Sequence, residues 1–277
     1  MKKLYEDFEK YQEIINKFDE NDGILDISDE TFLAPTTVCA LKCFIEDNNV
    51  VKIKSNPKLK KVLKNILNDE EISEKTPFVK LPFSRKEWFE SEEIFEFVDK
   101  LNSEKYLGFH SSFFITNELI TNIYDHSTIF KDEINKGFVF AFEYSNENIL
   151  DVCFVDNGLS IPNKFEIKDI DFKDDCDAIY KATQQFSTEN SPELGLYDRG
   201  IGLWATLKLT IKGNDGNALI VSRNGLLEIN SSESFKYELL NNMFKGTLVC
   251  LRFKDNQIQN FYDLIEMYDN FDFKYEV

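Results

Sequence analysis

The stretch ITNELITNIYDHS, residues 115–127, constrains the fold of this chain more than any other. At about 100° per residue, a helix here carries Glu118, Asn122 and Asp125 within roughly 60° of one another, and most of its remaining circumference is apolar. A helix that is apolar on most sides is usually buried, and a buried acid or amide is costly unless something pairs with it. The partner is a core hydrogen-bond network, a metal or a ligand; the alternative is a polar stripe exposed to water.

Bulk composition narrows the classes of function. The chain has 277 residues, enough for two domains or one large one, and 42% hydrophobic residues with 26 Phe predict an aromatic core. Fifty acidic against 32 basic residues give a net charge of −18, which argues against a general nucleic-acid binder and against binding to an anionic membrane surface. The charged N-terminal segment does not resemble a signal peptide, and no apolar stretch approaches the roughly 18 residues of a membrane span.

The cysteines favour a reduced, cytoplasmic protein. They are odd in number, form no CxxC pair and are accompanied by only 2 His, which argues against a zinc site. The five are Cys39, Cys43, Cys153, Cys176 and Cys250, and most of them lie in apolar runs and are predicted to be small core residues.

The N-terminal part predicts a small α/β unit. Its expected elements alternate as a helix within 1–18, a strand at 23–28, a helix at 34–46, a strand at 49–55 and a helix at 56–67. The acidic, proline-containing segment 68–78 is the best linker candidate. We therefore expect two domains, residues 1–75 and 76–277.

The second part predicts an α/β domain with a long internal loop. Helices are expected at 87–101, 111–126, 175–185, 202–212 and 257–268, and strands at 137–145 and 148–156, with four short strands after residue 216. The first of these helices is expected to bury Trp88, Phe95, Val98 and Leu101. Residues 186–199 show no period, and so long a loop in a compact domain is usually functional or mobile.

Three further motifs accompany the polar helix. In VDNGLSIP (155–162), Asp156 ends a strand and precedes a glycine turn, so that its carboxylate is able to accept hydrogen bonds from a ligand amine. In RGIGLWAT (199–206), glycines precede a helix whose N-terminus is able to bind phosphate. In KGTLVCLRF (245–253), a Gly-Thr pair opens a strand. Each motif alone is weak, because such turns are common.

In this order and spacing, the four motifs resemble the GHKL (Bergerat-fold) ATP-binding family, which includes gyrase, Hsp90, histidine kinases and the anti-sigma-factor kinases. The resemblance covers roughly residues 80–253 and is nearest to the anti-sigma-factor kinase type. It implies a Bergerat-type α/β sandwich, a mixed sheet covered by helices, that binds ATP with Mg²⁺.

The resemblance also implies roles for individual residues. Glu118 matches the glutamate that polarises the attacking water or an acceptor hydroxyl, and Asn122 matches the asparagine that ligates Mg²⁺ between the phosphates. Asp156 matches the aspartate that binds the adenine amine, Gly158 gives the adenine room, and Thr247 helps to hold Asp156 and a water. The expected phosphate contacts, below a lid formed by 186–199, are Arg199, Gly200, Gly202 and Leu203.

Two departures from the family pattern put phosphoryl transfer in doubt. Ser160 stands at the second glycine of the Asp-x-Gly-x-Gly loop, which is tolerated if the backbone there avoids positive φ. Asp125 stands where kinase members often carry a basic residue, and an acid there weakens the binding of phosphate. Arg199 either compensates for it or lies on the surface.

Residues 23–66 resemble a STAS domain, the fold of anti-sigma-factor antagonists. The shared features are a strand ending in Leu-Asp-Ile-Ser, a Phe-Leu before a polar turn, a helix, a second strand and a Pro-x-Leu helix. The family's phosphorylatable serine falls near Pro35, where this chain has none. Either Thr36 or Thr37 replaces it, or the site is lost.

The sequence therefore predicts a cytoplasmic Mg²⁺- and ATP-binding regulatory protein. Slow hydrolysis with Glu118 as general base would set a lid conformation and control a protein partner, with a homodimer as one arrangement. One alternative is a Ser/Thr kinase of the anti-sigma type acting on a STAS partner. Another is a non-catalytic module that senses nucleotide. Neither nucleic acid nor a membrane is an expected partner.

Overall fold

The structure is a computed structural model. It describes residues 3–18, 22–48, 50–67, 77–82, 84–101, 103–128, 136–184, 202–232 and 235–258, together with Phe261 and Leu264. The expected domain boundary near residue 76, most of the expected C-terminal helix and the expected lid lie outside these residues. The protein is mixed α/β, with one five-stranded and one two-stranded sheet.

A five-stranded sheet in the order β3-β4-β5-β7-β6 forms the centre of the molecule. Its strands are β3 (Phe78–Lys80), β4 (Gly137–Tyr144), β5 (Ile149–Asp156), β6 (Asn217–Ile229) and β7 (Phe235–Lys254). Every neighbouring pair is antiparallel, so the expectation of a mixed sheet is wrong for the described strands. The β4–β5 and β6–β7 pairs are hairpins, and a short connection of this kind joins antiparallel strands.

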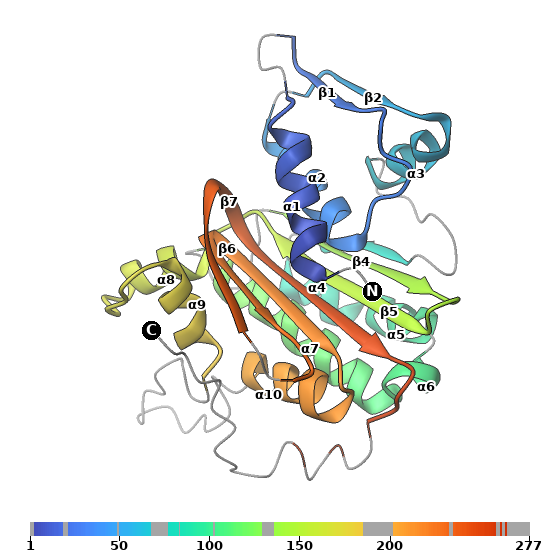
Figure 1. The fold of residues 1–277 in the computed structure, drawn as a ribbon. Helices are drawn as coiled ribbons and strands as arrows, with labels where there is room; N and C mark the ends of the chain where they lie inside the picture. The colour runs from blue at the N-terminus through green and yellow to red at the C-terminus, as the bar shows by residue number, and fades with distance from the viewer. Residues whose placement is uncertain are drawn as a thin grey trace.

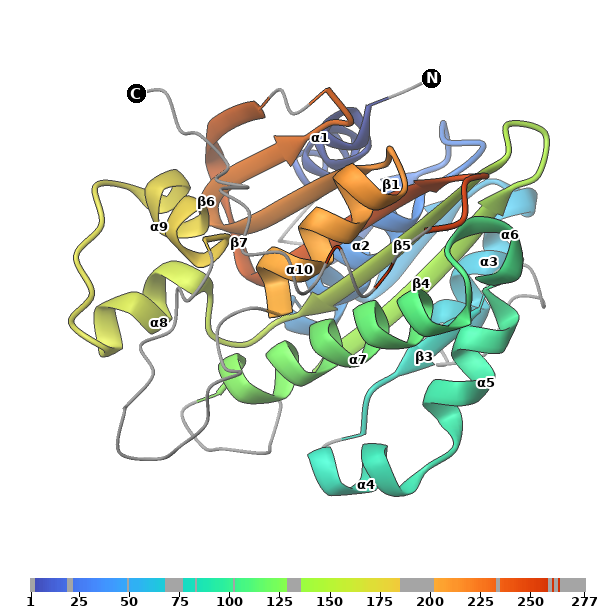
Figure 2. The ribbon, with the colours of Figure 1, turned by 90° about the horizontal axis from the view of Figure 1, so that it is seen from below.

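Helices cover one face of this sheet, as Figure 2 shows from below. They are α4 (Arg85–Glu90), α5 (Glu93–Lys100), α6 (Ser103–Tyr106), α7 (Phe109–His126) and α10 (Gly202–Lys208), which continues as the π-helix η2 (Leu209–Gly213). The helix α7 buries Leu119, Ile120 and Ile123 in one hydrophobic cluster with Val152 and Phe154 of β5. We call this the α7 face of the sheet.

The N-terminal unit covers the opposite face (Figure 1). It contains α1 (Leu4–Ile15), β1 (Ile24–Ile27), α2 (Pro35–Asp47), β2 (Lys52–Ser55) and α3 (Pro57–Leu67), with β1 and β2 paired in parallel. Phe8 of α1 and Leu41 of α2 belong to one hydrophobic cluster with Cys153 of β5 and Cys250 of β7. We call this the α2 face; the unit and the sheet share a core across it.

Several local predictions need correction. The helix expected at 87–101 is divided at Ser91 and Glu92 into α4 and α5, and Phe95 is 52% exposed instead of buried. The four expected short strands are two long ones, because irregular pairing between Ser222 and Gly225 bends β6 without ending it. The sequence did not predict α8 (Ile161–Ile167), which lies beside α9 (Asp175–Ala182) next to the β6–β7 hairpin.

The five cysteines are free and buried, as expected for core residues. Among the described residues, none of the helices combines the length and the apolar character needed to cross a bilayer.

Candidate functional site

Three polar side chains form a row across neighbouring strands on the α7 face. In β5, Val152 and Phe154 belong to the cluster that packs against α7, and side chains alternate along a strand, so Asp156 points to the same side. Asp156 pairs with Thr247 of β7, and Thr247 pairs with Ser222 of β6. The row Asp156–Thr247–Ser222 therefore crosses three neighbouring strands on this face, at the end of β5.

Hydrogen bonds hold the row in place. The Ser222 and Thr247 hydroxyl oxygens are 3.0 Å apart, and the backbone N–H of Ile161 donates to Ser222 Oγ at 2.8 Å. The backbone N–H of Gly158 donates to Asp156 Oδ1 at 2.9 Å. The row thus joins both strands to the turn that enters α8.

The carboxyl group of Asp156 is a buried acid with an altered pKa. Burial raises its pKa from 3.8 to about 7, although backbone hydrogen bonds from Gly158 and Thr247 act in the opposite direction. Only 4% of the residue is exposed. At neutral pH this group is therefore poised between its two forms, and a donor that reaches it favours the carboxylate.

The turn after Asp156 lies against the end of α7. The backbone N–H of Leu159 donates to Ser127 O at 2.7 Å. A Cβ at Gly158 would lie 2.0 Å from the same carbonyl oxygen, so no other residue fits there without moving the backbone. The glycine is thus needed for close approach of the two segments.

The start of α10 lies against the middle of α7. A Cβ at Gly202 would lie 2.2 Å from Glu118 Oε2, so the glycine leaves space for that carboxylate. Ser127 and Glu118 are roughly 14 Å apart along the axis of α7, at about 1.5 Å per residue. The two glycine turns therefore meet α7 at separate points, and Asn122 lies between them.

Glu118 and Asn122 are half-buried, and within the described part of the chain neither side chain forms a hydrogen bond. Burial raises the pKa of Glu118; the charge of Asp125 adds to the effect and that of Arg85 opposes it. The described residues contain no group of three or more His, Cys, Asp or Glu that could hold a metal. Asn122 suits a hard cation only if a ligand supplies further oxygens, as the phosphates of a nucleotide do.

Arg85 is a site residue that sequence analysis missed. Its guanidinium Nη1 lies 2.7 Å from Asp125 Oδ1, and its charge reaches Glu118. The acid that departs from the family pattern therefore holds a cation beside the polar arc of α7. Arg85 is 40 residues away in the sequence, and no local pattern marks it.

The Ser160 departure has a structural explanation. Its φ is −75°, so no glycine is needed there, and its hydroxyl caps α8 by accepting the backbone N–H of Asn163 at 3.2 Å. Serine at this position therefore caps the start of α8, and the conformational freedom of a glycine is not needed there.

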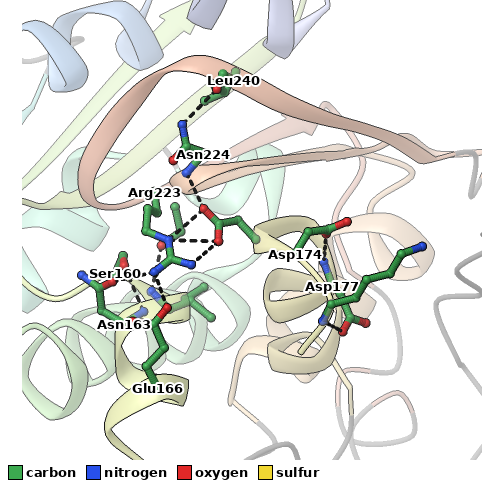
Figure 3. Close-up of polar contacts among 12 residues, drawn as sticks. Ser160, Asn163, Glu166, Asp174, Asp177, Arg223, Asn224 and Leu240 are labelled. Atoms are coloured by element: carbon green, nitrogen blue, oxygen red, sulfur yellow. Dashed lines mark hydrogen bonds and ion pairs between the residues drawn. The ribbon is translucent and has the colours of Figure 1, made fainter. Parts of the chain in front are cut away.

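The helices α8 and α9 are fixed beside this row by Arg223, which directly follows Ser222 (Figure 3). Its guanidinium bonds to Asp175 with both oxygens 2.9 Å from Nε, and to Asn163 at 2.9 Å and Glu166 at 2.6 Å. The hydrogen bonds and charge of Asp175, against a smaller effect of burial, raise the pKa of Arg223. One cation at the bend of β6 therefore ties both helices to the sheet.

All seven predicted site residues that the structure describes lie on α7 or on the turns and strands next to it: Glu118, Asn122, Asp156, Gly158, Gly202, Leu203 and Thr247. Leu203 is half-buried and packs on the α7-face cluster. Arg199 and Gly200 lie outside the described residues. Ser222 was missed, although a polar residue ending an apolar strand was a usable signal.

A hollow lies at the other end of the sheet. It has a volume of about 190 Å³ and is lined by acids, bases and aromatic rings, including Asp7, Glu30, Phe32, Tyr144 and Arg252. Its wall includes Ile149, at the start of β5, roughly 23 Å from Asp156 at about 3.3 Å per residue. It is therefore separate from the row of polar residues.

Comparisons with known proteins assign no family. A scan against protein-family models matches none of them, and a search of curated proteins finds no significant match.

Proposed function

We propose that this protein binds Mg²⁺ and ATP as a regulatory ATPase of the GHKL type, with a Bergerat-type sandwich formed by the sheet and the α7 layer. One observation carries the proposal: α7 meets the Gly158 turn at Ser127 and the Gly202 turn at Glu118, with Asn122 between. A nucleotide has a base at one end and phosphates at the other. This arrangement offers each of them a separate binding position, which we call a seat.

The adenine seat would be Asp156. Its carboxylate would accept the adenine amine, while Thr247 and Ser222 hold the neighbouring strands. The flat base would lie beside the turn at Gly158, which Ser127 fixes against the end of α7.

The phosphate seat would be the polar arc of α7. Asn122 would ligate Mg²⁺ together with phosphate oxygens, and Arg85, held by Asp125, would supply the positive charge that Asp125 itself lacks. Glu118 would orient the attacking water beside Gly202, and its raised pKa suits a general base. Magnesium, when bound, would neutralise the phosphate charge.

Two observations bear on the wider role. Thr36 and Thr37 are each 1% exposed, and the Thr37 hydroxyl donates to Asp7 O at 2.7 Å, which argues against either as a phosphorylation site. This favours hydrolysis over transfer to the chain's own STAS-like unit. We propose that the nucleotide state controls binding of a protein partner in the cytoplasm, consistent with five free, buried thiols.

Calorimetry with Mg-ATP, followed by γ-labelled turnover, tests the proposal. We expect saturable binding of ATP but not GTP, with label released as free phosphate. Glu118→Gln should keep ATP affinity within about threefold and lower turnover at least 100-fold, since it removes the general base. Glu93→Gln, an exposed acid on α5, is the matched control and should change neither. Label on protein would support the kinase, and no binding at millimolar ATP would refute the proposal.

A further inference from the structure

The last turn of α2 carries two acids at a position that the helix dipole makes unfavourable for negative charge. Glu46 and Asp47 lie at the C-terminal end, where the helix dipole is negative, and the last turn contains no basic residue. Each acid binds a group on the sheet or beside it, and Glu46 also pairs with a lysine of α2 itself. Glu46 pairs with Lys42 at 2.8 Å and Lys136 at 2.9 Å.

Asp47 joins two segments that support the adenine seat. Its Oδ1 accepts the side-chain N–H of Asn157 at 2.9 Å, and its Oδ2 lies 3.2 Å from Lys245 Nζ. Asn157 directly follows Asp156, and Lys245 lies two positions before Thr247. One carboxylate from the N-terminal unit therefore connects the residue that follows β5 to a position within β7 close to Thr247.

The contact with Asn157 determines how that side chain lies. Asn157 is 3% exposed, and its Oδ1 is buried without a hydrogen-bond partner among the described residues. Without Asp47, both ends of the buried amide would be unsatisfied, and the turn would have to rearrange to reach water. The neighbouring segment would move with it, because a Cβ at Gly246 would lie 2.0 Å from Asp156 O and 2.8 Å from Asn157 Cα.

We propose that Asp47 is a positioning residue of the nucleotide site, so that docking of α2 on the sheet sets the affinity for adenine nucleotides. This inference rests on the proposed function. Because coupling between two equilibria is reciprocal, adenine binding also tightens the docking of α2. Whatever protein binds the N-terminal unit then changes nucleotide affinity without touching the pocket.

Full-length variants test the inference by calorimetry with Mg-ATP. Asp47→Ala should weaken binding about tenfold, as expected for loss of one hydrogen bond to a charged group. Asp47→Asn keeps an acceptor for Asn157 and should stay within about twofold. The matched control is Asp7→Asn, which weakens the same interface at its far end, where Asp7 lies 3.5 Å from Arg252. It should lower the melting temperature yet leave ATP affinity unchanged.

Hydrogen exchange of the wild type supplies a test that needs no variant. ATP should slow exchange of the amides in the last turn of α2 but not those of α3. Wild-type affinity in Asp47→Ala, or unchanged exchange in α2 with ATP bound, would overturn the inference and leave the proposed function intact. Absence of ATP binding to the wild type would instead refute the proposed function itself.

Discussion

The two faces of the five-stranded sheet differ in how they treat buried charge. On the α2 face, Asp151 is fully buried, and its carboxylate bonds Arg252 through two contacts of 2.7 Å. Burial acts to lower the pKa of Arg252, but the bonds and charge of Asp151 outweigh it and the net shift is upward. On the α7 face, Asp156 is buried with backbone N–H groups, and none of the described residues places a cation on it. Burial raises the pKa of both acids, but the hydrogen bonds and charge of Arg252 act against that shift only at Asp151.

This difference supports the proposed roles of the two faces. On the α2 face, apolar side chains pack around the ion pair of Asp151 and Arg252. On the α7 face, among the described residues, Asp156 has no cation beside it, and Asn122 and Glu118 form no side-chain hydrogen bond. Functional sites commonly retain such unfavourable groups, because the same groups that bind a ligand cost stability without it.

The largest expected effect comes from exchanging the two acids of β5 for amides. Asp156→Asn should weaken ATP binding at least 100-fold, because the amide donates where the adenine amine also donates.

Asp156→Asn should also raise the stability of the fold at pH 8. The folded pKa of about 7 lies above the reference 3.8, so this group favours folding below pH 4 and loses that contribution as pH rises through 7, about 4 kcal/mol in all. Chemical denaturation at pH 5 and pH 8 measures the gain, which should be larger at the higher pH.

Asp151→Asn on the opposite face is the matched variant. It leaves Arg252 buried beside a neutral amide and should cost about 3–5 kcal/mol of stability, while the fraction that remains folded binds ATP with wild-type affinity. If both variants lost binding and stability together, the contrast between the two faces would be wrong.

Two glycine substitutions should separate the turns that meet α7. Gly158→Ala places a methyl group 2.0 Å from the Ser127 carbonyl, and backbone cannot yield cheaply, so we expect a loss of about 2–3 kcal/mol and of ATP binding. Gly202→Ala meets the end of the Glu118 side chain, which is able to rotate away. It should cost less than about 1 kcal/mol and mainly reduce turnover. Thermal melts and steady-state hydrolysis distinguish the two; equal destabilisation would contradict the assigned contacts.

The pH dependence of binding tests Asp156 without a mutation. Adenosine is the suitable probe, since it has no phosphate to titrate. If its amine binds the carboxylate, affinity should fall up to tenfold per pH unit below about 7 and stay level above it. An NMR titration from pH 5.5 to pH 8.5 measures this, and a flat profile would remove Asp156 from the adenine seat.

The smallest effect is expected at Ser160. Ser160→Gly restores the family's glycine but removes the cap of α8, at a cost of a few tenths of a kcal/mol, with ATP affinity unchanged. Improved ATP binding in a calorimetric titration would show that the serine obstructs the pocket.

Much of the architecture follows from local pattern. The 3.6-residue period predicted a helix at 111–126, where α7 runs from Phe109 to His126, and the alternating strands predicted the β4–β5 hairpin. The long β6 and β7 strands were missed because the bend at Arg223 depends on Asp175, Asn163 and Glu166, which no strand pattern contains. Phe95 was placed inside because periodicity cannot foresee the break between α4 and α5.

The site was predictable where its residues lie within motifs. Asp156, Gly158 and Gly202 stand at turns whose spacing is visible in sequence, and the structure places all three against or beside α7. Arg85 and Asp47 were not predictable, because each acts through a single contact that joins distant segments. Such contacts depend on how the helices pack on the sheet, whereas the sequence patterns predict only which helices and strands form.

A crystal structure with Mg²⁺ and a non-hydrolysable ATP analogue tests the central claim most directly. The account predicts the adenine amine on Asp156 beside Gly158, and the phosphates along the α7 arc between Asn122 and Gly202, with Arg85 turned toward them. Nucleotide bound instead in the hollow lined by Phe32 and Arg252, or an adenine that makes no contact with Asp156, would contradict it.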